Sequence, residues 1–265
     1  MNKKNIKQIV FISYLVILVY KYFSSTLLSQ QTHPPLLYPN LNILYWTFII
    51  SDLTDIFNYQ WIKYLLDISL FTSCILTLVN IKSNIYPIIF SVSLWFYQFL
   101  YFSIVAYQPF AIGLLFPCLP FIFKSEIKFF ITYNFGRYFL CWLYFFAGVL
   151  KIINQGIFNI NQLTDSIKVS AADFIFYNPN HIKTQIMAFL IENIYLSYSL
   201  FISAVIIELT FFIGFLTKKY DLHLAVLFLT FHLINYQILD LPFINHAIIV
   251  TFFLPLKNSL NYSSS

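Results

Sequence analysis

The chain has 265 residues, of which 60% are hydrophobic and only 9% are charged. Because a soluble domain carries about 25% charged residues, this composition excludes a water-soluble globular fold and predicts an integral membrane protein. The net charge of +5 does not indicate a nucleic-acid-binding protein, since the lysines are scattered at the ends of apolar segments rather than clustered on one face.

The apolar segments, taken in chain order, predict an all-α polytopic bundle of about eight transmembrane helices, since about 20 apolar residues cross a bilayer. The first segment, in "MNKKNIKQIVFISYLVILVY", resembles a signal peptide but has no small-residue cleavage site, so it is expected to remain as a span. The stretch 41–50 is short and is expected to be interfacial or re-entrant. The expected spans are 7–28, 61–81, 84–105, 108–123, 127–154, 188–217, 221–239 and 243–256.

The lysine positions support this count, because positive residues concentrate in cytoplasmic loops. With eight spans both termini are cytoplasmic, and three lysines, Lys63, Lys168 and Lys183, lie in outer loops. If 41–50 also crossed, most of the remaining lysines would lie outside. A bacterial chain of this kind is expected in the cytoplasmic membrane. The lysines expected inside are Lys3, Lys4, Lys7, Lys82, Lys124, Lys128, Lys218, Lys219 and Lys257.

A single transmembrane domain is expected over 1–257, with a polar tail over 258–265. The two long outer segments, 29–60 and 155–187, have no span of their own, and such loops usually bind a partner or carry function. No metal site is predicted, because the five histidines are scattered and the three cysteines form no CxxC pair.

Charged residues within spans cost about 2.5–3.5 kcal/mol each on insertion scales and therefore need a partner or a function. Arg137 and Glu208 lie at similar depths, counted from the inner ends of their spans, and are expected to form a buried ion pair. Lys151, near the outer end of its span, has three open interpretations. It extends to the interface, it pairs with Glu192, or its apolar surroundings keep it neutral and able to act as a general base.

A second group of polar residues is expected on the same outer half of the membrane as Lys151. His232, in "LTFHLINYQIL", is followed by Asn235 and Gln237, and residues three apart share a helix face. His246 lies near the outer end of the last expected span. Together these residues predict a polar cavity that opens to the outer side.

The stretch from Arg137 to about Leu256 resembles the membrane domain of the vitamin K-dependent gamma-carboxylases and their bacterial relatives, the horizontally transferred transmembrane (HTTM) family. The resemblance rests on "RYFLCWLYFFAGVLK", on Glu192 and Glu208, and on "FHLINYQ". It implies that Lys151 is a catalytic base that deprotonates a reduced, vitamin K-like quinone before O2 adds, and that His232 is a second catalytic candidate. The implied quinone-binding candidates are Tyr144, Phe145, Asn235 and Gln237.

The chain departs from the carboxylases at two points. Their Asn-His pair has no counterpart in "SIVAYQPFAIGLL", which has Tyr107 and Gln108, and their large extramembrane domain is not found in the 265 residues. Shorter bacterial relatives include a membrane protein that matures a secreted sporulation-delaying peptide together with a soluble partner. The resemblance therefore implies modification or maturation of a secreted peptide, with a soluble partner docking on 29–60 and 155–187.

Carboxylation itself stays open, and so does a different class of function. The alternative is a non-catalytic membrane subunit or immunity protein that binds a peptide or a partner protein. A transporter is less favoured, because broken helices at the midplane are typical of transporters and this chain has only five glycines.

Overall fold

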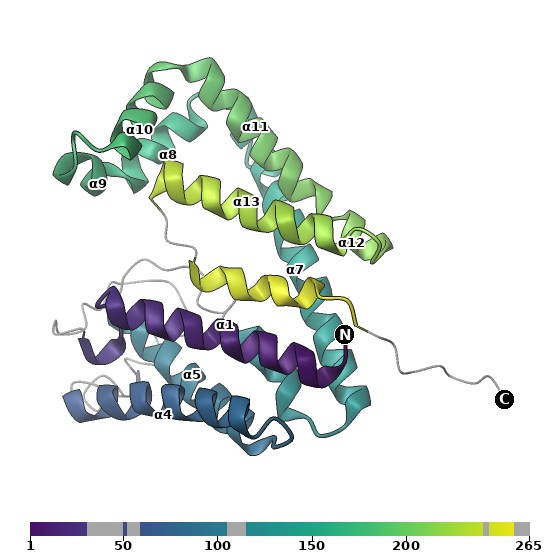
Figure 1. Cartoon of the computed structure of the whole chain (residues 1–265). Coiled ribbons are helices and arrows are strands. Elements are labelled where there is room, and N and C mark those ends of the chain that lie inside the picture. Colours follow the sequence, from purple (N-terminus) through teal and green to yellow (C-terminus); the bar gives the residue numbers. More distant parts are fainter. Residues whose placement is uncertain (31–49, 52–58, 105–114, 241–243, 257–265) are drawn as a thin grey trace. The chain divides into compact units, whose positions relative to one another are not determined.

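The computed structural model of this chain describes residues 1–30, 50–51, 59–104, 115–240 and 244–256. Within these ranges every regular element is helical (Figure 1), as the composition predicts. The expected interfacial stretch 41–50 lies almost wholly outside the described residues. Tyr107, Gln108 and the polar tail lie outside them entirely.

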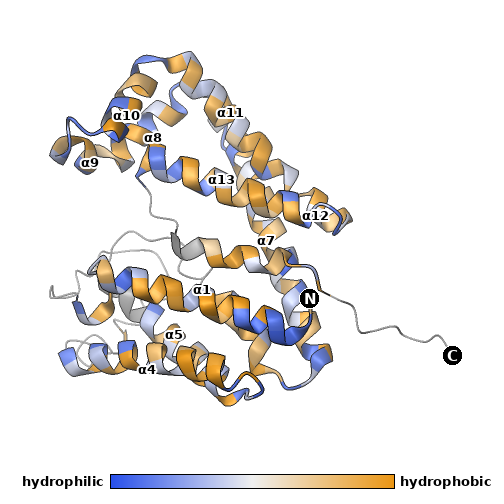
Figure 2. Cartoon of the chain, viewed as in Figure 1, coloured by the Kyte–Doolittle hydropathy of each residue, from blue (hydrophilic) through white to orange (hydrophobic). Residues whose placement is uncertain are grey.

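In the described residues, five helical stretches are long and apolar enough to cross a membrane, which confirms the fold class of an all-helical membrane protein. They are Lys3–Gln30, Gln60–Val79, Glu126–Ile153, Ile194–Leu216 and Asp221–Leu239. Hydrophobic colours dominate the middle of the helices α11 and α13 in Figure 2.

The expected count of eight spans is not confirmed. The expected span 84–105 is a helix, α5 (Ile85–Ile104), with a shorter apolar part at Ile85–Gln98. The described parts of the expected spans 108–123 and 243–256 contain the 3₁₀ helices η2 (Phe116–Ile122) and η4 (Ile244–Phe253). A 3₁₀ helix rises about 2 Å per residue, so the ten residues of η4 extend about 20 Å, less than the ~30 Å hydrocarbon core.

The chain divides into two compact units, and the single transmembrane domain expected over 1–257 stays a prediction. The first comprises residues 1–134 and 255–265, and the second comprises 135–254. The boundary falls inside the long helix α7 (Glu126–Ile153). The second unit covers nearly the same residues as the stretch 137–256 on which the family resemblance rests.

The first unit is built on α1 (Lys3–Phe23), α4 (Gln60–Val79) and α5, together with η1 (Leu28–Gln30) and η2. One stripe of α1 is buried, and its rings Phe11 and Tyr14 pack against Phe90 of α5 with centroids 5.2 and 4.7 Å apart. The opposite side of α1 is also apolar, with Ile12 and Val16 exposed, as expected where lipid replaces water.

Two lysines of α1 stabilise the first unit through backbone carbonyls. Lys7 Nζ donates to Ile81 O at 2.9 Å and to Ser83 O at 2.5 Å, in the turn between α4 and α5. Lys3 Nζ donates to Phe123 O, just after η2, at 2.8 Å. These lysines therefore satisfy carbonyls that the ends of helices leave unpaired.

The second unit contains the remainder of α7, followed by short helices, two candidate spans and η4. The short helices are η3 (Gly156–Phe158), α8 (Gln162–Ser170), α9 (Ala172–Tyr177) and α10 (Ile182–Glu192). The spans are α11 (Ile194–Thr210), extended by α12 (Ile213–Leu216), and α13 (Asp221–Leu239). The expected span 188–217 is therefore interrupted at Asn193, where α10 ends and α11 begins.

Gly136 of α7 permits close packing against η4. A Cβ atom at this position would overlap the ring of Phe252, which is only 2% exposed and has little room to move. The absence of a side chain at Gly136 therefore sets the distance between the two helices.

We expect Gly136→Ala to lower the free energy of unfolding by about 1–3 kcal/mol, the usual cost of overpacking. Thermal unfolding in detergent would show this as a drop in Tm of about 2–4 °C per kcal/mol. In a Phe252→Leu background the same substitution should cost less, because the ring that it meets is gone. An equal cost in both backgrounds would contradict the packing argument.

Candidate functional site

Helix α7 carries three polar side chains at intervals of seven residues: Arg137, Tyr144 and Lys151. Seven residues make nearly two helical turns, so the three lie on one stripe of the helix, about 10.5 Å apart. Each forms a side-chain contact with α11, with α13 or with the start of α13. The stripe thus joins α7 to the two other spans of the second unit.

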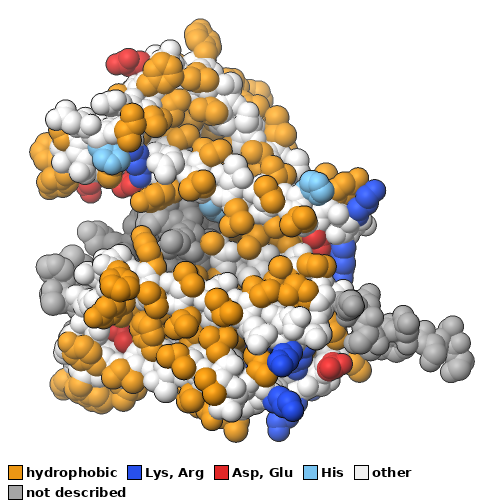
Figure 3. Space-filling model, viewed as in Figure 1, with side chains coloured by type: hydrophobic (Ala, Val, Ile, Leu, Met, Phe, Trp, Pro, Cys, Tyr) orange, Lys and Arg blue, Asp and Glu red, His pale blue; other side chains and the backbone are white. Residues whose placement is uncertain are grey.

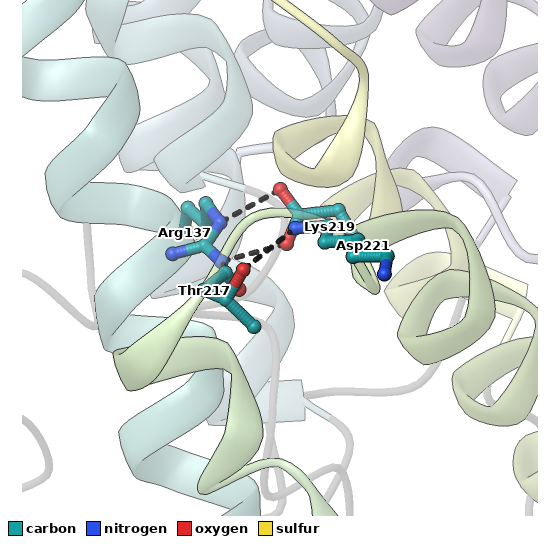
Figure 4. Close-up of polar contacts among 4 residues, drawn as sticks. All are labelled: Arg137, Thr217, Lys219 and Asp221. Carbon is teal, nitrogen blue, oxygen red and sulfur yellow. Dashed lines mark hydrogen bonds and ion pairs between the residues drawn. The ribbon is translucent and has the colours of Figure 1, made fainter.

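Arg137 binds the chain where α12 leads into α13 (Figure 4). Its Nε donates to Asp221 Oδ2 at 2.9 Å, and its Nη2 donates to Asp221 Oδ1 at 2.6 Å and to Thr217 O at 3.0 Å. The Lys219 N–H donates to Thr217 Oγ1 and completes the turn. This bidentate arrangement is the strongest form of Arg–carboxylate pair, and the Arg137 side chain is only 2% exposed.

The Arg137 charge also affects the pKa of Lys218, which lies in the same turn. Desolvation lowers the pKa of the Lys218 ammonium, the nearby Arg137 charge lowers it further, and Asp221 acts in the opposite direction. Arg137 therefore raises the positive potential at this end of the unit although its own charge is paired.

Lys151 binds Glu208 of α11, with Lys151 Nζ 2.5 Å from Glu208 Oε1. The two side chains differ in exposure, since Lys151 is 34% exposed and Glu208 only 5%. The second carboxylate oxygen, Oε2, is buried and has no hydrogen-bond partner in the described part of the chain. Gly148, one turn before Lys151, lets α11 approach closely, because a Cβ there would lie 3.2 Å from the Cβ of Glu208.

The predicted Arg137–Glu208 ion pair is wrong, because each residue pairs with a different partner. Depth was counted from the helix ends, which assumes that both helices begin at one level. Arg137 lies eleven residues into α7 and yet level with Thr217, whereas Glu208 lies nine residues before Thr217. Nine residues of helix extend about 13 Å, which an arginine side chain cannot bridge.

The pairing of Lys151 with Glu192 is also wrong. Glu192 is the last residue of α10 and is exposed, whereas Lys151 pairs with Glu208. The other two interpretations, extension to the interface and a neutral amine among apolar groups, did not include a carboxylate partner. Both now have to include Glu208, which lies beside the Lys151 ammonium group.

Tyr144 and His232 form the middle contact of the stripe. The Tyr144 hydroxyl and His232 Nε2 are hydrogen-bonded, and the buried Tyr144 ring packs against Phe211 and Phe228 at centroid distances of 4.8 and 5.1 Å. Tyr144 lies seven residues before Lys151 on α7 and joins this helix to α13 through His232.

Lys183 of α10 forms an ion pair with Asp240, the residue that ends α13 in a left-handed conformation. Its ammonium group also lies 4.7 Å from the ring centroid of Phe174 and 4.1 Å from that of Tyr236. Sequence reasoning assigned Lys183 only to an outer loop. The spacing of apolar residues in "IKTQIMAFLIE" is typical of a short helix, and this pattern could have placed Lys183 on a helix rather than in a loop.

The other candidates are more widely distributed. Phe145 packs against Phe212 at 5.2 Å, Asn235 is half-buried and Gln237 is exposed. His246 lies on η4. In the described residues no three His, Cys, Asp or Glu side chains are grouped so that they could hold a metal ion. Among the predicted site residues, the structure therefore brings together two pairs, Tyr144 with His232 and Lys151 with Glu208.

Comparisons with protein-family models, with curated proteins and with solved structures found no match to this chain. The HTTM family assignment therefore stays a prediction that rests on the residues quoted from the sequence.

We expect Asp221→Asn to lower the free energy of unfolding by about 3–5 kcal/mol, because it leaves the Arg137 charge buried without its partner. The double variant Arg137→Gln/Asp221→Asn should recover most of that loss, which thermal or denaturant unfolding in detergent would measure. Lys219→Gln is the matched control, because its backbone and not its side chain binds Thr217. A double variant as unstable as the single one would show that the pair is not a coupled unit.

Proposed function

We propose that this chain is a membrane protein that modifies or matures a secreted peptide, with Lys151 as the general base. The observation that carries the proposal is the pairing of a lysine that is one-third exposed with a buried glutamate. A substrate can reach the Lys151 amine, while Glu208 behind it is shielded from solvent. Such a pairing of a reachable base with a buried acid is a common arrangement in catalytic sites.

The pair provides a way to deliver a neutral amine. Lysine acts as a base only without its proton, and the short contact allows that proton to pass from Lys151 Nζ to Glu208 Oε1. The result is a neutral amine beside a neutral carboxylic acid, which a low-dielectric site tolerates better than two unpaired charges. Lys151 then accepts one proton from the substrate, which is left as the anion, and the ammonium form is restored.

The resemblance adds a co-substrate class, a reduced quinone together with O2. The residues present fit such a group, because Glu208 Oε2 is a buried acceptor without a partner in the described part of the chain and Phe145 and Phe212 offer apolar rings. A bound quinol would supply an acidic hydroxyl group and, with O2, the oxidising power for the reaction. The proposed role of the protein is to hold the hydroxyl beside Lys151 Nζ and to accept its proton.

The orientation and partners of the chain belong to the same proposal. Both termini are cytoplasmic, so that Lys151 lies toward the outer side where a secreted peptide arrives. A soluble partner that carries the peptide docks on the outer segments. Of these, 155–187 is described and contains α8, α9 and the first turns of α10.

Lys151→Arg tests the base directly. Arginine keeps the positive charge and can pair with Glu208, but it does not lose its proton, so folding should be retained and activity lost. We expect a fall of at least about 100-fold, the lower range for general base catalysis. Membranes that contain the protein would receive reduced naphthoquinone and O2, and quinone epoxide would be followed by mass spectrometry.

Lys183→Arg is the matched control, because Lys183 also forms an ion pair between helices but lies outside the proposed site. It should retain activity. Full activity of Lys151→Arg would show that only the positive charge matters and would overturn the base. An absence of epoxide with well-folded wild-type protein would contradict the quinol step.

A second candidate is a non-catalytic membrane subunit or immunity protein. One observation favours it, namely that Lys151, Arg137 and Lys183 all form ion pairs between elements of the second unit, as purely structural residues would. In that case Lys151→Arg would preserve protection or partner binding, while changes in the outer helices would abolish it.

A further inference from the structure

Helix α10 carries apolar residues on two of its sides, one buried and one exposed. Its inner side packs into the second unit, where Met187 and Leu190 join Ile167 and Ala171 in a buried cluster. Its outer side carries Ile182, Ile186 and Phe189, which are 65%, 43% and 54% exposed. These three residues follow the i, i+4, i+7 spacing, so they form one outward stripe.

Helix α8, which packs on the inner side of α10, has a different exposed side. Asp165 and Lys168 are exposed there, together with Val169. On α10 the only lysine, Lys183, is buried and paired with Asp240, and Glu192 at the last position is the exposed acidic residue. Gln185 is also exposed on α10, so this helix has both polar and apolar exposed residues, whereas the exposed residues of α8 are mainly polar.

A membrane span with exposed apolar residues follows α10 directly in the chain. One residue, Asn193, separates α10 from α11, whose exposed residues include Leu196, Leu200 and Ile206. Exposed tyrosines lie on both sides of α10 in the chain, with Tyr195 at the start of α11 81% exposed and Tyr177 at the end of α9 76% exposed. Tyrosine is enriched where a protein passes from hydrocarbon to headgroups, because its ring is apolar and its hydroxyl is polar.

We infer that the Ile182–Ile186–Phe189 side of α10 lies in the lipid bilayer, at the boundary between headgroups and acyl chains. The eleven residues of α10 extend about 16 Å, too short to cross the ~30 Å core, so the helix lies in the interface. Hydrophobic side chains also cover much of the visible surface of this unit in Figure 3, as a lipid-facing protein requires. Helix α8 faces water and remains accessible to a soluble partner.

The inference divides the outer segment 155–187, which sequence reasoning treated as one docking loop. Only its α8 side is available to a partner, while α10 anchors the group to the membrane surface. Lys183 then has a clear structural role, because it joins this lipid-embedded helix to the end of α13 through Asp240. The inference is independent of the chemistry proposed for Lys151.

Spin labels at single introduced cysteines would test this placement. Ile186→Cys and Phe189→Cys probe the stripe, and Asp165→Cys and Lys168→Cys are the matched positions on α8. The purified full chain would be labelled and reconstituted in vesicles of phosphatidylcholine and phosphatidylglycerol, with no other protein present. Collisions of the label with O2, which concentrates in lipid, and with a polar nickel chelate, which stays in water, are then measured by electron paramagnetic resonance.

We expect O2 to relax labels at 186 and 189 more strongly than the nickel chelate does, with the order reversed at 165 and 168. A stronger effect of the chelate at 186 and 189 would place the stripe in water and overturn the inference. Weak collisions with both reagents would show that a second copy of the chain covers it, which would also overturn the inference. The native cysteines Cys74, Cys118 and Cys141 are buried, and unsubstituted protein carried through the labelling measures their background.

Discussion

The second unit depends on how charge is neutralised within apolar helices. A charged side chain within a membrane span costs about 2.5–3.5 kcal/mol on insertion scales, and more when no partner is near. Arg137, Lys151 and Lys183 each have a carboxylate partner on another element. Helix α13 is bound in this way at both ends, through Asp221 at its start and Asp240 just after its last turn. These ion pairs fix the register of α7, α10, α11 and α13 in a bundle where hydrophobicity alone gives little preference.

Helix α7 can carry this arrangement because small residues alternate with the polar ones along its stripe. Cys141 follows Arg137 by four residues, and Gly148 follows Tyr144 by four. A Cβ at Gly214 of α12 would overlap the sulfur of Cys141, and Gly148 lies against Glu208 and Leu209. Short side chains let the helices approach, and close approach allows the longer polar side chains to reach their partners.

The contacts along the stripe are not equivalent. Arg137 is buried and bound bidentately, which suits a permanent clamp, whereas Lys151 is partly exposed beside a carboxylate with one free oxygen in the described structure. Tyr144 and His232 stand between these two sites in an aromatic environment. The difference in exposure and hydrogen bonding makes Lys151, rather than Arg137 or Lys183, the residue best suited to chemistry.

Composition alone determined that the chain is a helical membrane protein, because 9% charged residues cannot cover a water-facing surface. Hydrophobic length located each of the five helices that, in the part of the chain the structure describes, are able to span the membrane. The spans expected at 108–123 and 243–256 stay predictions, because their described residues contain the 3₁₀ helices η2 and η4, and apolar content does not distinguish an α-helix from a 3₁₀ helix.

The sequence also singled out Arg137, Lys151, Glu208 and His232, since polar groups in apolar runs are costly, and the family resemblance added Tyr144. Their partners could not be predicted, because pairing depends on how far each helix is shifted along its neighbour. Counting residues from the end of each helix gives no information about that shift. Asp221 and Asp240, at the ends of α13, became partners only through the tertiary structure. The sequence determined which charges needed neutralising, and helix packing decided which carboxylate neutralises each one.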